Sequence, residues 1–296
     1  MLFIAAAVLG LMLSRLGAPR RNFRVVGFVN IWIAVPGIFL IVYLTRGFLV
    51  EDIGVSIFSA ALTFILIGLL VLATRGMVKE FRGSVILNGA FVNAINLPLP
   101  ILQVLMGNYS YAVTFATTMT VIQILAAAIF QGYLRTSSGC GGGVSFARLV
   151  PLLSFATGVV LHYTVWPIAA TSVVVGDTDV IVNFLIAIIF VYFGLSFGAS
   201  LITSSSQYKL VSRPFLATAM FRLLVGPLLG LVLAIPLGKG SDVYLQMVFL
   251  ATMPPAITNT VLAAIYGFDG VLTANATSVL TPINTVEAIA LFYILR

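Results

Sequence analysis

The hydrophobic residues of this chain form long runs separated by short polar stretches. A helix needs about 17 to 25 apolar residues to cross a bilayer, and most of these runs have that length. Alternating polarity with a period of two, typical of membrane β-strands, is absent. The pattern therefore predicts an all-α membrane protein with ten transmembrane helices. The predicted spans are residues 2–18, 26–45, 54–74, 84–106, 110–134, 149–171, 179–203, 213–237, 243–266 and 272–295.

Two of the predicted spans contain prolines next to uncharged polar residues. These residues are Asn93, Asn96, Pro98 and Pro100 in the fourth span, and Pro254, Pro255, Thr258 and Asn259 in the ninth. Proline removes a backbone donor and interrupts a helix, and inside hydrocarbon the freed groups need partners from protein or from a water-filled cavity. We therefore expect both interruptions to line a site. The alternative is that the prolines only kink packed helices, with Asn and Thr bonding between them.

A Gly- and Ser-rich segment, Thr136–Val144, divides the chain into two sets of five spans. The predicted organisation is a first five-helix repeat at 1–135, a cytoplasmic linker at 136–148 and a second five-helix repeat at 149–296. Because five is odd, the second repeat is inverted in the membrane relative to the first, as in many secondary transporters. The two interrupted spans then occupy equivalent positions, fourth and ninth.

Composition and charge agree with this plan. The chain is 61% hydrophobic and 8% charged, which excludes an ordinary soluble domain. With the N-terminus outside, eleven Lys and Arg fall in cytoplasmic connections and three on the outer side. Since basic residues favour the cytoplasmic side, we expect a multi-pass protein of the cell membrane with both termini outside. The net charge of +7 reflects this topology, so no nucleic-acid partner is expected.

The interruptions also indicate the sign of a ligand. Pro98 and Pro255 are suited to the first position of a following half-helix, where a missing donor costs nothing. The exposed N–H groups at such helix starts favour an anion. Asn96 is a candidate cap for the first start, and the neighbouring amides and hydroxyl offer hydrogen bonds without fixed charge. The expected ligand is a small anion bound near the middle of the membrane.

Three ionisable residues fall inside predicted spans, and each is costly there. Arg222 is a candidate for ligand binding or for a charge pair. Glu287 is its candidate partner, or a carboxylate that carries a proton or binds a cation such as Na⁺. His162 is expected to be a packed or interfacial histidine. Four uncharged polar residues in or near spans carry no individual prediction: Gln103, Gln123, Asn183 and Gln246.

An intramembrane enzyme is the competing class of function. It would need a nucleophile with a base, or a metal cluster. The chain has one His, one Cys and Glu287 as its intramembrane carboxylate. We therefore expect neither an enzyme nor a metal or cofactor site.

At the two interruptions the sequence resembles the auxin efflux carrier family, which includes plant auxin exporters and microbial malonate and malate permeases. The similar motifs are N-A-I-N-L-P-L-P-I-L-Q-V-L-M-G, A-T-M-P-P-A-I-T-N-T-V-L-A-A-I-Y-G-F-D, R-L-L-V-G-P and V-P-G-I-F-L. The resemblance implies a ten-helix fold shared with bile-acid sodium symporters, with scaffold and transport subdomains and two broken helices that cross at the substrate site. It further implies frequent dimerisation through the scaffold. It also implies that the polar residues and prolines of both interruptions surround the substrate, with Arg222 nearby. The long cytoplasmic loop of some plant carriers is missing.

Together these features predict a secondary carrier for a small organic anion such as a carboxylate, working by alternating access around the crossing. Membrane lipid and a second copy of the chain are the expected partners. The alternative is a sodium-coupled symporter of the bile-acid type, which would bind cations at the same crossing.

Overall fold

The computed structural model describes residues 8, 12, 20–133, 149–165, 172–204 and 212–296. Within these residues the secondary structure is helical, and the extended backbone is limited to one isolated bridge. The predicted linker 136–148 and all but two residues of the predicted first span lie outside the described residues.

The described helices overlap the predicted spans from 26–45 onward, with ends shifted by up to seven residues, and the fourth and ninth spans are each divided into two helices. In the first half they are α2 (Arg20–Val29), the π-helix η1 (Asn30–Ala34), α3 (Val35–Arg46), α4 (Val50–Ala73), α5 (Lys79–Ala90), α6 (Pro98–Met106) and α7 (Ser110–Tyr133). In the second half they are α8 (Val150–Thr164), α10 (Ser172–Ser204), α11 (Arg213–Met220), the π-helix η3 (Phe221–Val225), α12 (Gly226–Leu233), the 3-10 helix η4 (Ile235–Leu237), α13 (Asp242–Ala251), α14 (Thr258–Tyr266) and α15 (Gly270–Leu295).

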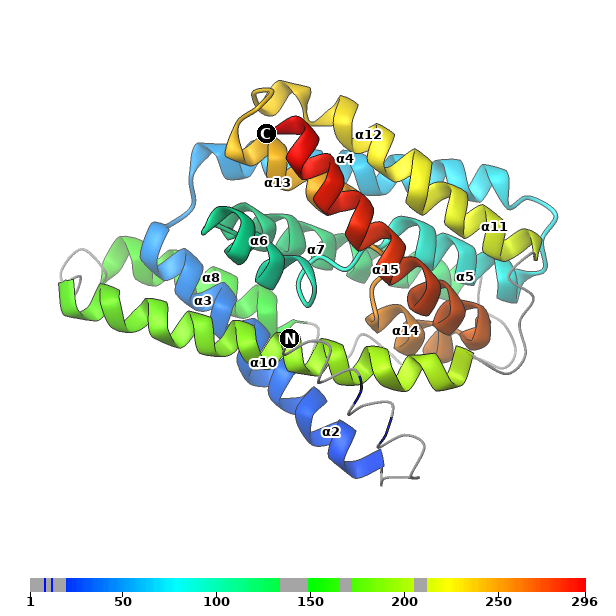
Figure 1. Cartoon of the computed structure of the whole chain (residues 1–296), viewed down its shortest axis with the longest axis horizontal. Helices are drawn as coiled ribbons and strands as arrows, with labels where there is room; N and C mark the ends of the chain where they lie inside the picture. The colour runs from blue at the N-terminus through cyan, green and yellow to red at the C-terminus, as the bar shows by residue number, and fades with distance from the viewer. Residues whose placement is uncertain (1–7, 9–11, 13–19, 134–148, 166–171, 205–211) are drawn as a thin grey trace.

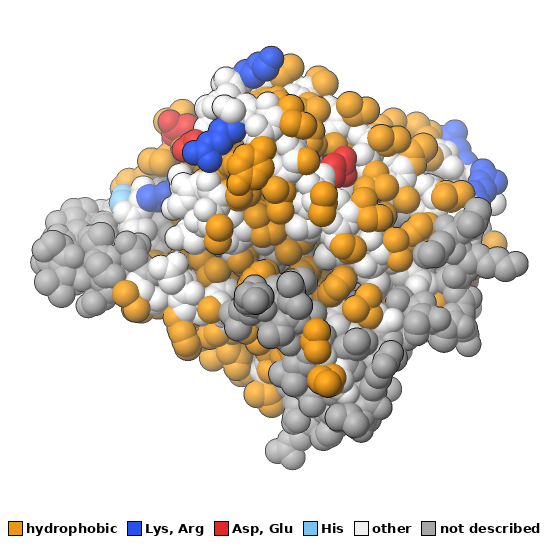
Figure 2. All heavy atoms as spheres, in the orientation of Figure 1, with side chains coloured by type: hydrophobic (Ala, Val, Ile, Leu, Met, Phe, Trp, Pro, Cys, Tyr) orange, Lys and Arg blue, Asp and Glu red, His pale blue; other side chains and the backbone are white. Residues whose placement is uncertain are grey.

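The surface is that of a protein embedded in lipid. Five helical stretches of the described chain are long and apolar enough to cross a membrane, and three apolar helices are shorter. Large hydrophobic side chains are widely exposed, among them Val50 at 81% and Val104 at 85%. Figure 2 shows hydrophobic side chains across the middle of the visible face, with Lys and Arg toward its opposite edges. Exposed apolar area on this scale is expected where hydrocarbon replaces water, so the chain is a multi-pass membrane protein.

The helices form two groups. In the first group α3 packs along α8 and against α10, and in the second α4 packs against α5, α7, α12 and α13 (Figure 1). Helix α10 also runs along α15 and so joins the two groups. Gly158 of α8 allows the closest approach within the first group, because a Cβ there would lie 2.7 Å from the carbonyl oxygen of Leu40 on α3.

Helix formation stops at both proline-containing interruptions. The chain leaves α5 after Ala90 and re-enters a helix at Pro98, as predicted; it leaves α13 after Ala251 and re-enters at Thr258. The following helices, α6 and α14, are each nine residues long. Each ends at a glycine in the left-handed region, Gly107 with φ 67° and Gly267 with φ 70°, where glycine alone adopts the conformation without strain.

The second half-helix therefore starts three residues later than the predicted start at Pro255. Pro255 lies in extended backbone opposite Val92, so it cannot adopt the helical conformation of a first turn. The backbone N–H of Asn259 then donates to the carbonyl of Ala256 at 3.0 Å, which begins the turn that leads into α14.

Candidate functional site

The two interruptions pair with each other through their backbones. The N–H of Asn93 donates to the carbonyl of Pro254 at 2.8 Å, and the N–H of Ala256 donates to the carbonyl of Phe91 at 3.2 Å. Together these bonds form an antiparallel bridge between Val92 and Pro255. Groups that lose their helical partners at the breaks thus find new partners in the other break, which the membrane interior requires.

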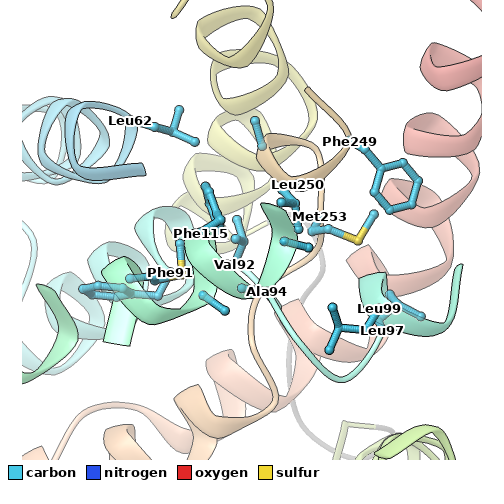
Figure 3. Close-up of a cluster of buried hydrophobic side chains, with 14 of the residues drawn as sticks. Leu62, Phe91, Val92, Ala94, Leu97, Leu99, Phe115, Phe249, Leu250 and Met253 are labelled. Atoms are coloured by element: carbon cyan, nitrogen blue, oxygen red, sulfur yellow. The ribbon is translucent and has the colours of Figure 1, made fainter. Parts of the chain in front are cut away.

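Apolar side chains surround this pairing and keep it dry. Figure 3 shows Phe91 and Val92 of the first interruption near Phe115 of α7, with Leu250 of α13 and Met253 of the second interruption beside them. All five side chains are buried. Because hydrogen bonds strengthen in a medium of low dielectric, the two bonds at the crossing hold the interruptions together firmly.

A pocket of about 140 Å³ opens beside the paired backbones. It is lined by Val92, Asn93, Ala94, Ile95, Asn96, Ala116, Met119, Thr120, Gln123, Ala256 and Thr258. Three of these are predicted site residues: Asn93, Asn96 and Thr258. The lining carries amides and hydroxyls and no charged side chain. Such a pocket binds a polar ligand group through hydrogen bonds, and its size suits a small ligand.

Asn93 and Asn96 form a local network at the pocket. The N–H of Asn96 donates to Asn93 Oδ1 at 3.1 Å, and Asn96 Oδ1 accepts from Asn30 Nδ2 at 3.3 Å. Asn96 therefore does not cap α6 as predicted, and that helix starts without a side-chain cap. Asn93 Nδ2 is buried and has no hydrogen-bond partner. It is a donor in the wall of the pocket that a ligand oxygen can use.

Asn259 lies away from the pocket and serves the fold. Its side chain is fully buried, and its Nδ2 donates to the carbonyls of Leu87 and Phe91, both at 3.1 Å. The same nitrogen lies 3.4 Å from Asn88 Oδ1. Both carbonyls also accept one backbone N–H, from Phe91 and Ala256 respectively, so Asn259 of α14 adds a second donor at the end of α5.

The four predicted prolines are buried in the interruptions and do not line the pocket. Pro98 and Pro100 lie in the first turn of α6. Pro254 supplies the carbonyl that accepts from Asn93, and Pro255 forms the bridge. Their contribution is to create the two breaks rather than to contact the pocket.

Arg222 lies in η3, between α11 and α12. Its side chain reaches the start of the second interruption, just after α13. Its side chain is fully buried, and its Nη1 donates to the carbonyl of Met253 at 3.3 Å, while Nε and Nη2 have no hydrogen-bond partner. The C-terminal end of a helix carries partial negative charge, so the cation is favourably placed there. Arg222 does not line the pocket.

Arg222 and Glu287 are linked through a third residue. Within the described part of the chain the ion pair is Arg46 with Asp52, at 2.7 Å, so Arg222 and Glu287 form no direct pair. Asn284 Nδ2 instead donates to the backbone carbonyl of Arg222 at 3.0 Å and to Glu287 Oε2 at 3.2 Å. This indirect link replaces the contact that the sequence suggested.

Sequence reasoning missed three buried amides near the interruptions: Asn30, Asn88 and Asn284. Asn30 opens η1, just as Arg222 lies in η3, and each of these π-helices directs a polar side chain at one interruption. Single-turn π-helices are frequent at functional sites. The sequence does carry a signal for the two π-helices, because a proline follows each of them at the start of the next α-helix.

His162 is packed as expected, with Nδ1 2.8 Å from the carbonyl oxygen of Leu44.

The apolar helices of the described residues define a multi-pass membrane protein. Residues 150–286 match the family described as membrane transport protein, the auxin efflux carrier family, and this match supports the resemblance found at the motifs. The matched region runs from α8 into α15 and includes the second interruption and Arg222. That family consists of membrane transporters and not of enzymes. A search of the curated proteins found no match.

Proposed function

We propose that this protein is a secondary carrier of a small organic anion, such as a carboxylate, that works by alternating access around the paired interruptions. The backbone pairing of Asn93 with Pro254, directly beside a polar pocket, is the observation that carries the proposal. Irregular backbone is tolerated at membrane depth where it is buried in protein or lines a cavity, and transporter sites are built this way.

The pocket favours an anion through donors rather than through a fixed charge. Asn93 offers an unused N–H donor. Thr258, the first residue of α14, is exposed at the pocket, so the positive end of that helix dipole faces the ligand. Without a cation in its lining the pocket holds the ligand weakly enough to release it, as a carrier requires.

The proposed architecture is two inverted repeats of five helices, with α5–α6 and α13–α14 as the equivalent crossing pairs. The equal lengths of α6 and α14, their matching glycine ends and the antiparallel pairing support it. We also propose that both termini lie outside and that the first helix group, α3 with α8 and α10, forms the contact in a homodimer.

Coupling to Na⁺ or H⁺ is the second candidate. Among the described residues, buried oxygen atoms that accept no hydrogen bond include Asn30 Oδ1 and Asn259 Oδ1, whose side chains bond to the interruptions, and Thr277 Oγ1 and Asn284 Oδ1 on α15. Oxygen atoms of this type are ligands for hard cations, as in a sodium symporter of the bile-acid type. Glu287, linked to Arg222 through Asn284, is the candidate for proton coupling.

Uptake of labelled malonate, malate and indole acetate into proteoliposomes, with and without Na⁺ and pH gradients, tests both proposals. Asn93→Ala and Thr258→Val should raise KM roughly tenfold, because each removes one hydrogen bond to a charged ligand. Thr164→Val is the matched control, since Thr164 is also an exposed threonine but bonds to Val160 of its own helix at 2.8 Å. Saturable uptake with unchanged KM in both site variants would refute the pocket assignment.

A further inference from the structure

A second and larger cavity, of about 300 Å³, lies between the two helix groups. It is lined by Val42, Thr45, Arg46, Gln103, Gly107, Asn108, Tyr109, Ser110, Val182 and Asn183. We call it the Arg46 cavity. The lining combines α3 and α10 of the first group with α6 and the start of α7 from the second. Helix α6 therefore lies between the pocket at the interruptions and the Arg46 cavity. The segment that precedes α6 lines the pocket, and the C-terminal end of α6 lines the Arg46 cavity.

Arg46 is the charged residue in the lining of this cavity, and its guanidinium is held in place. Nη2 donates to Asp52 Oδ1 at 2.7 Å and to Thr114 Oγ1 at 3.1 Å. The guanidinium carbon also lies 5.5 Å from the ring centre of Tyr43 and 5.3 Å from that of Tyr111. A cation stacked against two rings keeps its position with little loss of entropy on binding a ligand.

Asp52, the carboxylate that pairs with Arg46, binds only one of the three guanidinium nitrogens. Asp52 is fully buried and also accepts from the N–H of Leu49 at 2.7 Å and from the Thr114 hydroxyl at 2.6 Å. Arg46 Nε and Nη1 are buried and make no hydrogen bond, and the Arg46 side chain as a whole is 18% exposed while Asp52 is not exposed. The cavity thus meets the positive side of the pair.

The other polar groups around the cavity are uncharged. Helix α7 begins at Ser110, so its positive end lies at the cavity wall, where the Ser110 N–H donates to Asn108 Oδ1 at 3.0 Å. Gln103 Nε2 and Asn183 Oδ1 lie 3.5 Å apart on α6 and α10, a long contact that leaves the Gln103 amide able to turn toward a ligand. A cation, a helix start and amides are the combination that recognises a carboxylate.

We propose that the Arg46 cavity is a second binding site for the carboxylate group of a small organic anion, through which the ligand passes between the end of α6 and the pocket at the interruptions. The choice of ligand rests on the proposed function, while the site itself rests on Arg46 and its surroundings. In this site Arg46 turns one of its free nitrogens to the carboxylate and keeps its bond to Asp52.

Protection of an engineered cysteine tests this site without measuring transport. The chain has a single cysteine, Cys140, so Cys140→Ser with Asn183→Cys places one thiol at the cavity. Asn183 is exposed, and its replacement should react readily with a maleimide in protein held in lipid nanodiscs. Malonate should slow that reaction severalfold, whereas malonamide, of similar size but uncharged, should not.

Two further variants decide whether Arg46 binds the anion. Arg46→Gln should raise the malonate concentration for half protection roughly tenfold or more, and Arg46→Lys should raise it less. If Arg46→Gln is not recovered folded, Val182→Phe replaces it, because a larger side chain at this lining residue fills the cavity and should abolish protection without removing the charge. Asn96→Ala, at the other pocket, should leave protection unchanged even where it stops transport.

The site would be overturned if malonate gave no protection, or if malonamide protected equally well. It would also be overturned if protection were unchanged in Arg46→Gln, or in Val182→Phe where that variant is used. Loss of protection in Asn96→Ala would overturn it as well. Failure of transport with intact protection would reject the proposed carrier function and retain this site, so the two proposals fail separately.

Discussion

Asn259 and Arg222 show how a polar side chain inside a membrane protein can be used for hydrogen bonds to backbone carbonyls. Asn259 donates from its side-chain amide to the carbonyls of Leu87 and Phe91 at the end of α5, and Arg222 donates from Nη1 to the carbonyl of Met253 in the second interruption. Each side chain therefore stabilises backbone carbonyls at one of the two interruptions. An unpaired carbonyl there would meet no water, so these side chains are part of what makes the interruptions stable.

Asn259→Ala should destabilise the protein by about 0.5 to 1.5 kcal/mol, because it removes a buried side-chain donor from the carbonyls of Leu87 and Phe91, each of which keeps one backbone N–H donor. Thermal unfolding in detergent should show a lower Tm. The neighbouring Thr260→Ala is the control, since the Thr260 hydroxyl bonds only to Ile257 of its own turn, at 2.7 Å. A normal Tm with lost substrate affinity would instead place Asn259 in the binding site.

At the scale of single elements, the glycines decide how closely helices approach. A Cβ on Gly158 would lie 2.7 Å from the Leu40 carbonyl oxygen and 3.1 Å from Tyr43 Cβ, and neither can move without shifting α3. Small residues at such contacts let membrane helices pack backbone to backbone. The α3–α8 contact of the first helix group thus depends on the absence of one methyl group.

Gly158→Ala should lower thermal stability by about 1 to 3 kcal/mol, the usual cost of overpacking. Gly68→Ala on α4 is the matched control, because a Cβ there meets nothing within 4 Å and alanine favours the helix. The Tm of both variants can be measured by tryptophan fluorescence or scanning calorimetry, and Gly158→Ala should have the lower value. An equal Tm for the two would mean that α8 does not pack on α3 as described.

The sequence allowed the helices and their interruptions to be predicted, but not the direction of side chains within the interruptions. Hydropathy and proline chemistry are local, so the spans from 26–45 onward and the start of α6 at Pro98 followed from the sequence. Whether Asn93 or Asn259 faces the pocket depends on how two distant segments pair, which is a tertiary property. The shift of α14 from Pro255 to Thr258 has the same origin, since pairing with Val92 overrides the preference of proline for a helix start.

For the whole molecule, the contacts between the two helix groups are where alternating access must act. Polar bonds cross between the groups near the Arg46 cavity, from Tyr43 to Thr114 at 2.7 Å and from Arg46 to Thr114 at 3.1 Å. Exchangeable polar contacts of this type suit rigid-body movement between two states, in which the packing of α10 along α15 would also have to shift.

A cross-link between the groups should stop transport and be reversible. Gln103→Cys with Asn183→Cys, in the Cys140→Ser background, places two thiols where the native side chains lie 3.5 Å apart. Oxidation should abolish proteoliposome uptake and reduction should restore it, while each single-cysteine variant should be insensitive to oxidant. Undiminished uptake by the fully cross-linked protein would show that α6 and α10 do not move apart during transport.

The backbone pairing of the two interruptions also has a consequence for biosynthesis. The N–H of Asn93 and the carbonyl of Phe91 obtain their partners from residues 254 and 256, which are synthesised about 160 residues later, when the first interruption has already left the ribosome. Until then the first half carries unpaired backbone groups in the bilayer, so it should remain in the insertion machinery or attract chaperones until the second half arrives. Expressed alone, the first half should be degraded, and coexpression with the second half should rescue it.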